Sequence, residues 1–231
     1  NRPEKKNALT RAMYAAMSGA LRAGDADPSV RCHVFLGVPG AFSAGNDLAD
    51  FMAMATGGEG GGEVWDFLIA LAESEKPMLS GVDGVAVGIG TTLHLHCDLT
   101  FATPRTAFHT PFVDLGLVPE AGSSLIAPLL MGRQQAFALL GLGEPLAADK
   151  AKAVGLIYDV VSEDALEWPV PAVAARVAAR PPQALKFARD MMREPRSALI
   201  ERIRIESEEF RARLKSDEAR TALMAFFNRK K

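Results

Sequence analysis

The sequence has few cysteines, little net charge and no long hydrophobic run, and each shortage excludes a class of protein. Only Cys32 and Cys97 occur, both in apolar segments, so we expect buried free thiols rather than a disulfide, and a reducing, cytoplasmic setting. The net charge of −2 gives no electrostatic basis for binding nucleic acid or an anionic membrane. No apolar run reaches the roughly 18 residues that a membrane-spanning helix needs.

What is present is the composition of a globular protein with a sizeable core. The 231 residues are 48% hydrophobic and 23% charged, enough for one large domain or a domain with an appendage. The opening "NRPEKKNALT" is typical of a turn that leads straight into a helix. We therefore expect a further strand to precede residue 1 in the complete fold.

Apolar spacing along the chain predicts an α/β fold with several short parallel strands. The first helix is expected over 8–24, with Thr10 as its cap and Gly24 at its end. The other elements expected in this part are a buried strand over 31–38, a helix over 64–75, a strand over 78–82, a glycine turn over 84–90, a buried helix over 89–97, a strand over 99–102, an extended segment over 108–112, helices over 123–130 and 133–140, and a helix, glycine stop and strand over 147–161.

Two segments differ in character from this alternation. "ATGGEGGGE", residues 55–63, is glycine-rich and predicts a mobile surface loop. From Pro181 onward only helical periodicity remains. We therefore divide the chain into a core over 1–180 and a helical C-terminal region over 181–231.

Two glycine turns could present backbone amides. In "FSAGNDL", residues 42–48, Gly45 permits a positive φ, although a plain capped helix start explains the same letters. In "GVAVGIGTTL", residues 84–93, glycines punctuate a strand-to-helix turn, but Leu93 stands where a dinucleotide fingerprint needs its third glycine. Two converging amides are what a developing oxyanion needs, since pre-aimed dipoles stabilise charge in the transition state.

A lone carboxylate, Glu120, lies in the otherwise apolar stretch "GLVPEAGSS". Burial there should raise its pKa and make it a usable base or acid near neutral pH. The alternative is an acid placed at a helix N-terminus, where the helix dipole favours it. The pair His94 and His96 does not predict a metal site, because positions two apart on a helix face different sides and no companion ligands follow.

Taken together, these segments resemble the crotonase (enoyl-CoA hydratase/isomerase) superfamily over essentially the whole chain. The likeness is carried by "NRPEKKNAL", "FSAGNDL", "KPMLSGVDGVAVGIGTTLHLHCDLTFA", "AFHTPFVDLGLVPEAGSS" and "AADKAKAVGL". It implies a spiral of ββα turns with a helical C-terminal region, assembled as trimers or paired trimers. It implies an acyl-coenzyme A thioester as ligand, with coenzyme A as part of the substrate and no separate cofactor.

The resemblance also implies roles for individual residues. The backbone amides of Asn46 and Ile89 would form an oxyanion hole. The two catalytic glutamates of the hydratases would fall at Thr92 and Phe112, whereas Glu120 matches the single glutamate of the peroxisomal-type 3,2-enoyl-CoA isomerases. The residues expected near the substrate are Lys5, Lys6, Ser43, Ala44, Asp47, Leu48, Phe51, Gly88, Phe112, Leu117, Phe226 and Arg229.

Three functions stay open at this point. The leading hypothesis is an isomerase that shifts the double bond of a 3-enoyl-CoA to the 2-trans position by proton transfer from C2 to C4 through Glu120. The second is a hydratase, or another crotonase-type reaction on an acyl-CoA, that uses Glu120 differently. The third is a non-catalytic protein that binds acyl-CoA.

Overall fold

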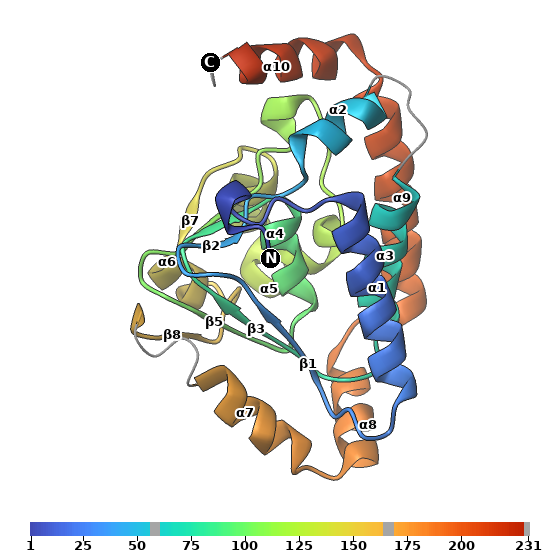
Figure 1. Ribbon diagram of the computed structural model, residues 1–231, viewed down its shortest axis with the longest axis vertical. Helices are drawn as coiled ribbons and strands as arrows, with labels where there is room; N and C mark the ends of the chain where they lie inside the picture. Colours follow the sequence, from blue (N-terminus) through green and yellow to red (C-terminus); the bar gives the residue numbers. More distant parts are fainter. Residues whose placement is uncertain (56–60, 164–168, 229–231) are drawn as a thin grey trace.

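A computed structural model of the protein describes residues 1–55, 61–163 and 169–228 (Figure 1). Within these ranges the strands form two four-stranded sheets, ordered β1-β3-β5-β8 and β2-β4-β6-β7. Neighbouring strands run parallel apart from the β6–β7 pair. The strands are β1 His33–Leu36, β2 Ala41–Ser43, β3 Met78–Val82, β4 Val85–Val87, β5 Leu99–Ala102, β6 Ala107–His109, β7 Leu146–Ala147 and β8 Asp159–Val160.

Helices surround these sheets and form the C-terminal part of the chain. In Figure 1, α7 and α8 lie at one end of the molecule and α10 at the other. The α-helices are α1 Arg11–Ala26, α2 Leu48–Ala55, α3 Gly62–Glu73, α4 Ile89–Thr92, α5 Ser123–Leu140, α6 Ala148–Ala153, α7 Pro169–Ala178, α8 Pro182–Met192, α9 Arg196–Leu214 and α10 Asp217–Asn228; the 3-10 helices are η1 Pro3–Lys5, η2 Leu93–His96 and η3 Val113–Leu115.

The chain passes repeatedly from one sheet to the other. Each of β1, β3 and β5 leads after a short connection into β2, β4 and β6 of the second sheet. Asp83 holds one such corner: its buried carboxylate accepts hydrogen bonds from the Gly40 amide at 2.6 Å, Thr103 Oγ1 at 2.6 Å and Arg105 Nε at 2.7 Å. One carboxylate therefore joins all three connections between the sheets.

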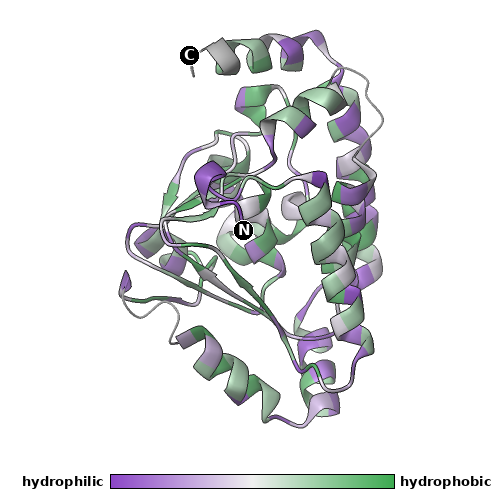
Figure 2. Cartoon of the chain, in the orientation of Figure 1, coloured by the Kyte–Doolittle hydropathy of each residue, from purple (hydrophilic) through white to green (hydrophobic). Residues whose placement is uncertain are grey.

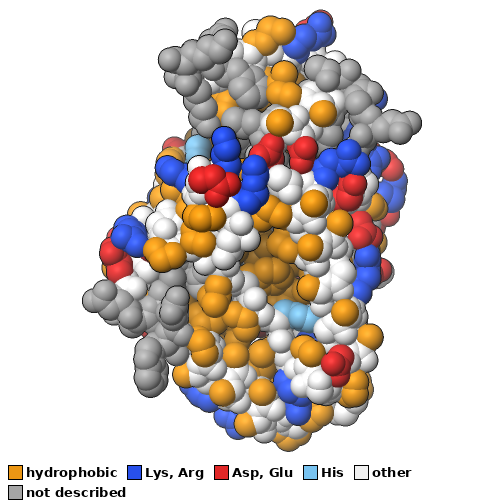
Figure 3. All heavy atoms as spheres, viewed as in Figure 1, with side chains coloured by type: hydrophobic (Ala, Val, Ile, Leu, Met, Phe, Trp, Pro, Cys, Tyr) orange, Lys and Arg blue, Asp and Glu red, His pale blue; other side chains and the backbone are white. Residues whose placement is uncertain are grey.

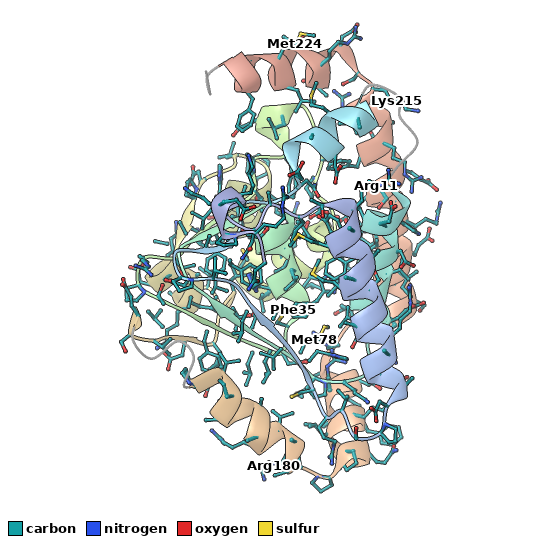
Figure 4. All side chains as sticks on the ribbon, viewed as in Figure 1. Arg11, Phe35, Met78, Arg180, Lys215 and Met224 are labelled. Carbon is teal, nitrogen blue, oxygen red and sulfur yellow. The ribbon has the colours of Figure 1, made fainter. Side chains whose placement is uncertain are left out.

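Alternation along β3 and β5 divides their side chains between two clusters. Met78 and Val82 face the main core, whereas Leu79 and Phe101 face the smaller cluster that Val170 of α7 completes. In Figure 2 hydrophilic residues recur along α9, although this helix packs against α3 and α5. Figure 4 shows Phe35 and Met78, on the paired strands β1 and β3, in the middle of the molecule.

Most of the expected elements are confirmed. The strands over 78–82 and 99–102 have the predicted bounds, and Thr10 caps α1 by accepting a hydrogen bond from the Met13 amide at 3.3 Å. The two helices expected over 123–140 form one element with a kink at Gly132, where φ is 77°. The alternation of strands and helices, with a helical C-terminal region, confirms the α/β fold class.

Four details of the sequence reading are wrong. Gly24 does not end α1 but lies inside it; the position requires glycine because a Cβ there would meet the His33 ring at 2.5 Å. The strand expected to be buried over 31–38 is shorter, and Val34 and Leu36 are exposed. The glycine turn over 84–90 contains β4, and the helix over 89–97 divides into α4 and η2. Of the loop expected over 55–63, Ala55 belongs to α2, Gly62 and Glu63 begin α3, and residues 56–60 lie outside the described ranges.

Three further observations bear on the class of protein. Cys32 and Cys97 are free thiols, both half-buried. Of the helices that the structure describes, none combines the length and the apolar character needed to cross a membrane. Among the same residues, no group of three or more His, Cys, Asp or Glu side chains is arranged to hold a metal ion.

The Asp83 corner should contribute stability in a pH-dependent way. Mainly through the Arg105 hydrogen bond, the fold lowers the pKa of Asp83 from 3.8 to about 2. Its stabilising contribution is therefore complete well above pH 3.8 and is lost as the pH falls through about 2. We expect Asp83→Asn to lower the free energy of unfolding at pH 7 by about 1–3 kcal/mol. Urea unfolding at pH 7 and pH 3 should show a smaller difference from wild type at pH 3, and an equal difference would contradict this account.

Candidate active site

Two glycine turns lie side by side where β2 and β4 end. The strands pair in parallel, and Gly45 and Gly88 follow them with φ values of 88° and 57°. A Cβ on Gly45 would lie 3.0 Å from the Val87 carbonyl oxygen, so the turns are in contact. Within the described part of the chain, no hydrogen bond occupies the backbone N–H of Asn46 or of Ile89, the residue after each glycine. Both amides are thus without a hydrogen-bond partner in this part of the chain.

The N-terminal segment holds the first of these turns. The Ala44 amide donates to the Lys6 carbonyl at 2.8 Å, and the Leu9 amide donates to the Gly45 carbonyl at 2.8 Å. Ser43 Oγ donates to the Asn7 carbonyl at 2.9 Å. Lys6 and Asn7 reach these positions in the left-handed region, with φ of 49° and 52°. The expected substrate residues of 5–6 and 43–44 therefore meet at one place, with the Lys5 and Lys6 side chains exposed.

Side-chain contacts fix the segment around Asn46 further. The Tyr14 hydroxyl, from α1, donates to Asn46 Oδ1 at 2.5 Å. Burial raises the pKa of Tyr14 well above its ordinary value, and the Glu120 charge adds to this rise, so the phenol stays neutral and close to Glu120. Asp47 accepts from Arg2 Nη1 at 2.8 Å and from the Ala49 amide at 3.0 Å, which caps α2.

Glu120 is buried on the loop before α5, with 6% of its surface exposed. Burial is the main cause that raises its pKa from 4.5 to about 7; the Thr92 hydroxyl, which donates to Oε1 at 2.7 Å, lowers it, and the charge of Glu206 raises it. The side chain of Glu120 does not cap α5. The N-cap residue of this helix is Gly122, which has no side chain to accept a hydrogen bond from the first turn. The carboxylate is therefore directed to the short helix α4 instead.

Helix α4 connects the carboxylate to the second glycine turn. It begins at Ile89, whose amide is unoccupied, and ends at Thr92, which bonds Glu120. Three residues of α-helix advance about 4.5 Å along the axis. Tyr14 makes the corresponding link on the other side, since it bonds Asn46 and lies within electrostatic reach of Glu120. The two amides and the carboxylate are thus linked through α4 and Tyr14, and their joint action at one site is a prediction.

The surroundings of this site are apolar. Phe112, Leu117 and Phe51 belong to the same buried cluster as the Glu120 neighbour Ala121. The Leu117 amide donates to the Phe112 carbonyl at 2.8 Å, which ties the two together around η3. On the face shown in Figure 3, hydrophobic side chains gather around a hollow in its middle, while basic and acidic side chains are interspersed elsewhere.

The remaining expected site residues lie on α10 or outside the described residues. Phe226 is half-buried on α10, which packs against η3: a Cβ on Gly116 would meet the Ala219 backbone at 2.7 Å. Arg229 lies outside the described residues, as does the side chain of Leu48.

His94 and His96 are buried, and burial lowers their pKa values to about 3 and about 4. Both rings are therefore neutral.

Sequence reasoning missed two residues of this site. Tyr14 belongs to no sequence motif that indicates a role, and its hydrogen-bond partner Asn46 is 32 positions away in the chain. Glu206 did carry a signal. It lies on the same face of α9 as Leu199, Ile203 and Phe210, which pack into the core, so an acid interrupts an apolar stripe at helical spacing.

Comparison with known proteins identifies the family of this chain. A family model described as enoyl-CoA hydratase/isomerase matches residues 1–231. Rat enoyl-CoA delta isomerase 2 is 35% identical over 236 residues, which cover 100% of this chain and 60% of that protein. The 1,2-epoxyphenylacetyl-CoA isomerase of Escherichia coli (strain K12) is 33% identical over 187 residues, covering 78% of this chain and 71% of that protein. A crystal structure of an enoyl-CoA hydratase/isomerase from Pseudoalteromonas atlantica T6c has a TM-score of 0.93 at 36% identity, covering 99% of this chain and 91% of that one.

The fold is accordingly the crotonase fold. The chain belongs to the enoyl-CoA hydratase/isomerase family, which confirms the resemblance seen in the sequence. It spans 60% of the length of the rat and human delta isomerase 2 proteins that it matches. The roles of individual residues remain predictions.

The Thr92 contact can be tested without any substrate. Thr92→Val keeps the shape of the side chain but removes the hydroxyl that donates to the Glu120 carboxylate. Because a hydrogen bond to the ionised form lowers the pKa of an acid, we expect the pKa of Glu120 to rise above the wild-type value of about 7. Infrared difference titration, assigned with Glu120→Gln, measures this pKa. An unchanged or lower midpoint would show that Thr92 does not bond the carboxylate.

Proposed function

We propose that the protein is a 3,2-enoyl-CoA isomerase, which converts a 3-enoyl-CoA thioester into the 2-trans-enoyl-CoA. The observation that carries this proposal is the environment of Glu120. Its carboxylate is buried and has a pKa raised to about 7. It accepts a hydrogen bond from Thr92, at the end of the helix α4 that begins with the unoccupied amide of Ile89. Its charge also acts on Tyr14, which bonds the side chain of Asn46, the residue with the second unoccupied amide. That arrangement supplies one base and two oxyanion donors, which is what a proton shift beside a thioester carbonyl requires.

Glu120 is distinguished from the other buried carboxylates by its partners. In the described part of the chain, the buried acids are Asp83, Glu120 and Glu206. Asp83 is bonded by Arg105, Thr103 and the Gly40 amide, and Glu206 by two amides and a hydroxyl. Glu120 has the single hydroxyl of Thr92. It is therefore the buried acid that is free to take up and release a proton.

In the proposed reaction, the thioester carbonyl oxygen accepts hydrogen bonds from the amides of Asn46 and Ile89. Glu120 removes a proton from C2; the C2–H electrons form the C1=C2 bond of a dienolate that keeps its C3=C4 bond, and the carbonyl π electrons move onto the carbonyl oxygen. The protonated Glu120 then returns the proton to C4, and the double bond moves from C3–C4 to C2–C3. No water enters and no proton is lost. A pKa of about 7 suits both steps, because Glu120 acts first as a base and then as an acid.

The residues at the positions of the hydratase glutamates support isomerisation over hydration. By the family resemblance these positions are Thr92 and Phe112, neither of which can activate water. Thr92 donates to Glu120, and Phe112 lies 6% exposed in the apolar cluster with Leu117. An apolar wall beside the acyl chain excludes the water that a hydratase must position.

Substrate handling, assembly and location form part of the same proposal. Lys5 and Lys6 would approach the coenzyme A portion, together with Phe226 and Arg229 of a neighbouring subunit. A homotrimer, or a pair of trimers, is supported by large exposed hydrophobic side chains such as Leu129 and Phe137, at 62% and 64% exposure. A cytoplasmic setting is supported by the two unpaired thiols.

The direct test compares wild type with Glu120→Gln on 3-hexenoyl-CoA and quantifies 2-hexenoyl-CoA and 3-hydroxyhexanoyl-CoA separately. We expect wild type to form the 2-enoyl product without prior hydration. Loss of the only base should reduce kcat by roughly 10²–10⁴. Because glutamine has the shape of glutamate, hexanoyl-CoA should still bind the variant, which isothermal titration calorimetry measures.

A matched control is Glu144→Gln, which changes the charge by the same amount at an exposed position outside the site. Its activity should equal that of wild type. Full activity in Glu120→Gln would contradict the role of Glu120. Hydration of 2-hexenoyl-CoA without conversion of 3-hexenoyl-CoA would favour a hydratase, and binding of hexanoyl-CoA with turnover of neither compound would favour a binding protein.

A further inference from the structure

Helix α9 directs a buried carboxylate at the loop that carries Glu120. Glu206 is 6% exposed, although it belongs to a helix that is otherwise rich in solvated charges. Glu206 Oε2 accepts from the Gly122 amide at 2.6 Å, and Oε1 accepts from the Ser124 amide at 2.9 Å and from Ser124 Oγ at 2.5 Å. Three donors on two oxygens suit an ionised carboxylate, which only accepts; burial raises the pKa of Glu206, and the hydrogen bonds from Ser124 and Gly122 oppose that rise. Glu206 thus occupies the N-terminal turn of α5.

The loop between Glu120 and α5 has a conformation that needs such support. Ala121 and Gly122 both adopt positive φ values, 62° and 71°, and alanine is disfavoured there. The loop also presses on α9, since a Cβ on Gly122 would lie 2.3 Å from Leu199 Cδ1. From the other side, His96 Nε2 lies 2.7 Å from the Ala121 carbonyl oxygen; a carbonyl only accepts, so Nε2 carries the proton. Glu206 and His96 therefore clamp the loop from two helices.

The position of Glu206 also has an electrostatic consequence. The N-terminus of a helix of this length attracts negative charge, and Glu120 is the acid immediately before it. An unoccupied N-terminus would stabilise ionised Glu120 and make it a weaker base. Glu206 satisfies the amides of this turn and adds a negative charge of its own. The groups that face the two acids are Thr92 and Tyr14 beside Glu120, and Ser124 and Arg202 beside Glu206.

We propose that Glu206 is a positioning residue for the reaction: its carboxylate holds the first turn of α5, fixes the loop that carries Glu120, and places a negative charge behind the catalytic carboxylate. This inference rests on the proposed function for its catalytic meaning. The arrangement of the loop and its charge are properties of the free protein. The same side chain therefore sets both where the base lies and how strongly it holds a proton.

The experiment uses Glu206→Gln, with Glu209→Gln as the matched control. Glu209 is on the same helix, is exposed, and loses the same charge. In free protein, infrared titration of the Glu120 carboxyl should show its midpoint at lower pH in Glu206→Gln, because removal of the Glu206 charge favours the ionised form of Glu120. The acid limb of kcat/KM for 3-hexenoyl-CoA should move by the same amount. Glu209→Gln should leave both at their wild-type values.

A second variant separates charge from geometry and serves if Glu206→Gln does not fold. Glu206→Asp keeps the charge but shortens the reach to the amides of Gly122 and Ser124. We expect kcat to fall about tenfold through misplacement of the base, with KM nearly unchanged. The Glu120 midpoint should stay close to that of wild type.

Two results would overturn the proposal. One is a Glu206→Gln protein that unfolds at lower urea concentration while its Glu120 midpoint stays at the wild-type pH, which is the behaviour of a purely structural group. The other is a Glu206→Asp protein with wild-type kcat. The titration needs no substrate, so it tests Glu206 even if Glu120→Gln remains active and the proposed function fails.

Discussion

The site depends on keeping the Glu120 carboxylate out of water. Burial raises its pKa to about 7, and the proposed isomerisation uses this property, because the carboxyl would first accept a proton and then return it near neutral pH. The same burial opposes folding. A carboxyl whose pKa is higher in the folded than in the unfolded chain destabilises the fold increasingly as the pH rises above 4.5, and the cost is complete above about 7. Interactions elsewhere in the molecule must therefore offset the free energy of unfolding that is lost by burying Glu120.

The remaining architecture places donors around that one charge. Two parallel strands end in adjacent glycine turns, which leave the amides of Asn46 and Ile89 unoccupied. Four residues of helix then bring Thr92 to Glu120. Asp83 stabilises the corner from which β4 departs, and α9 presses on the loop behind the base. Because a fold does not by itself set the reaction, the side chains placed on this scaffold decide which chemistry the site supports.

Much of this could be predicted because the signals were local. The strands over 78–82 and 99–102 are apolar runs bounded by turns, and both glycine turns are visible in seven to ten letters. β2, β4 and β7 have two or three residues each, too few for a period to show. Helix α7 has two prolines within its first three residues, and the sequence of this segment did not predict a helix. Tyr14 and Glu206 act across 32 and 82 or more positions, and only the fold brings them to the site.

The most direct measurement follows the proton itself. With 3-hexenoyl-CoA carrying deuterium at C2, in ordinary water, mass spectrometry and NMR locate the label in 2-hexenoyl-CoA. If one desolvated carboxylate both removes and returns the proton, part of the deuterium should appear at C4, and Glu120→Gln should abolish the transfer. Product that forms readily but carries only solvent protons at C4 would contradict a single sheltered base, and with it the role assigned to Glu120.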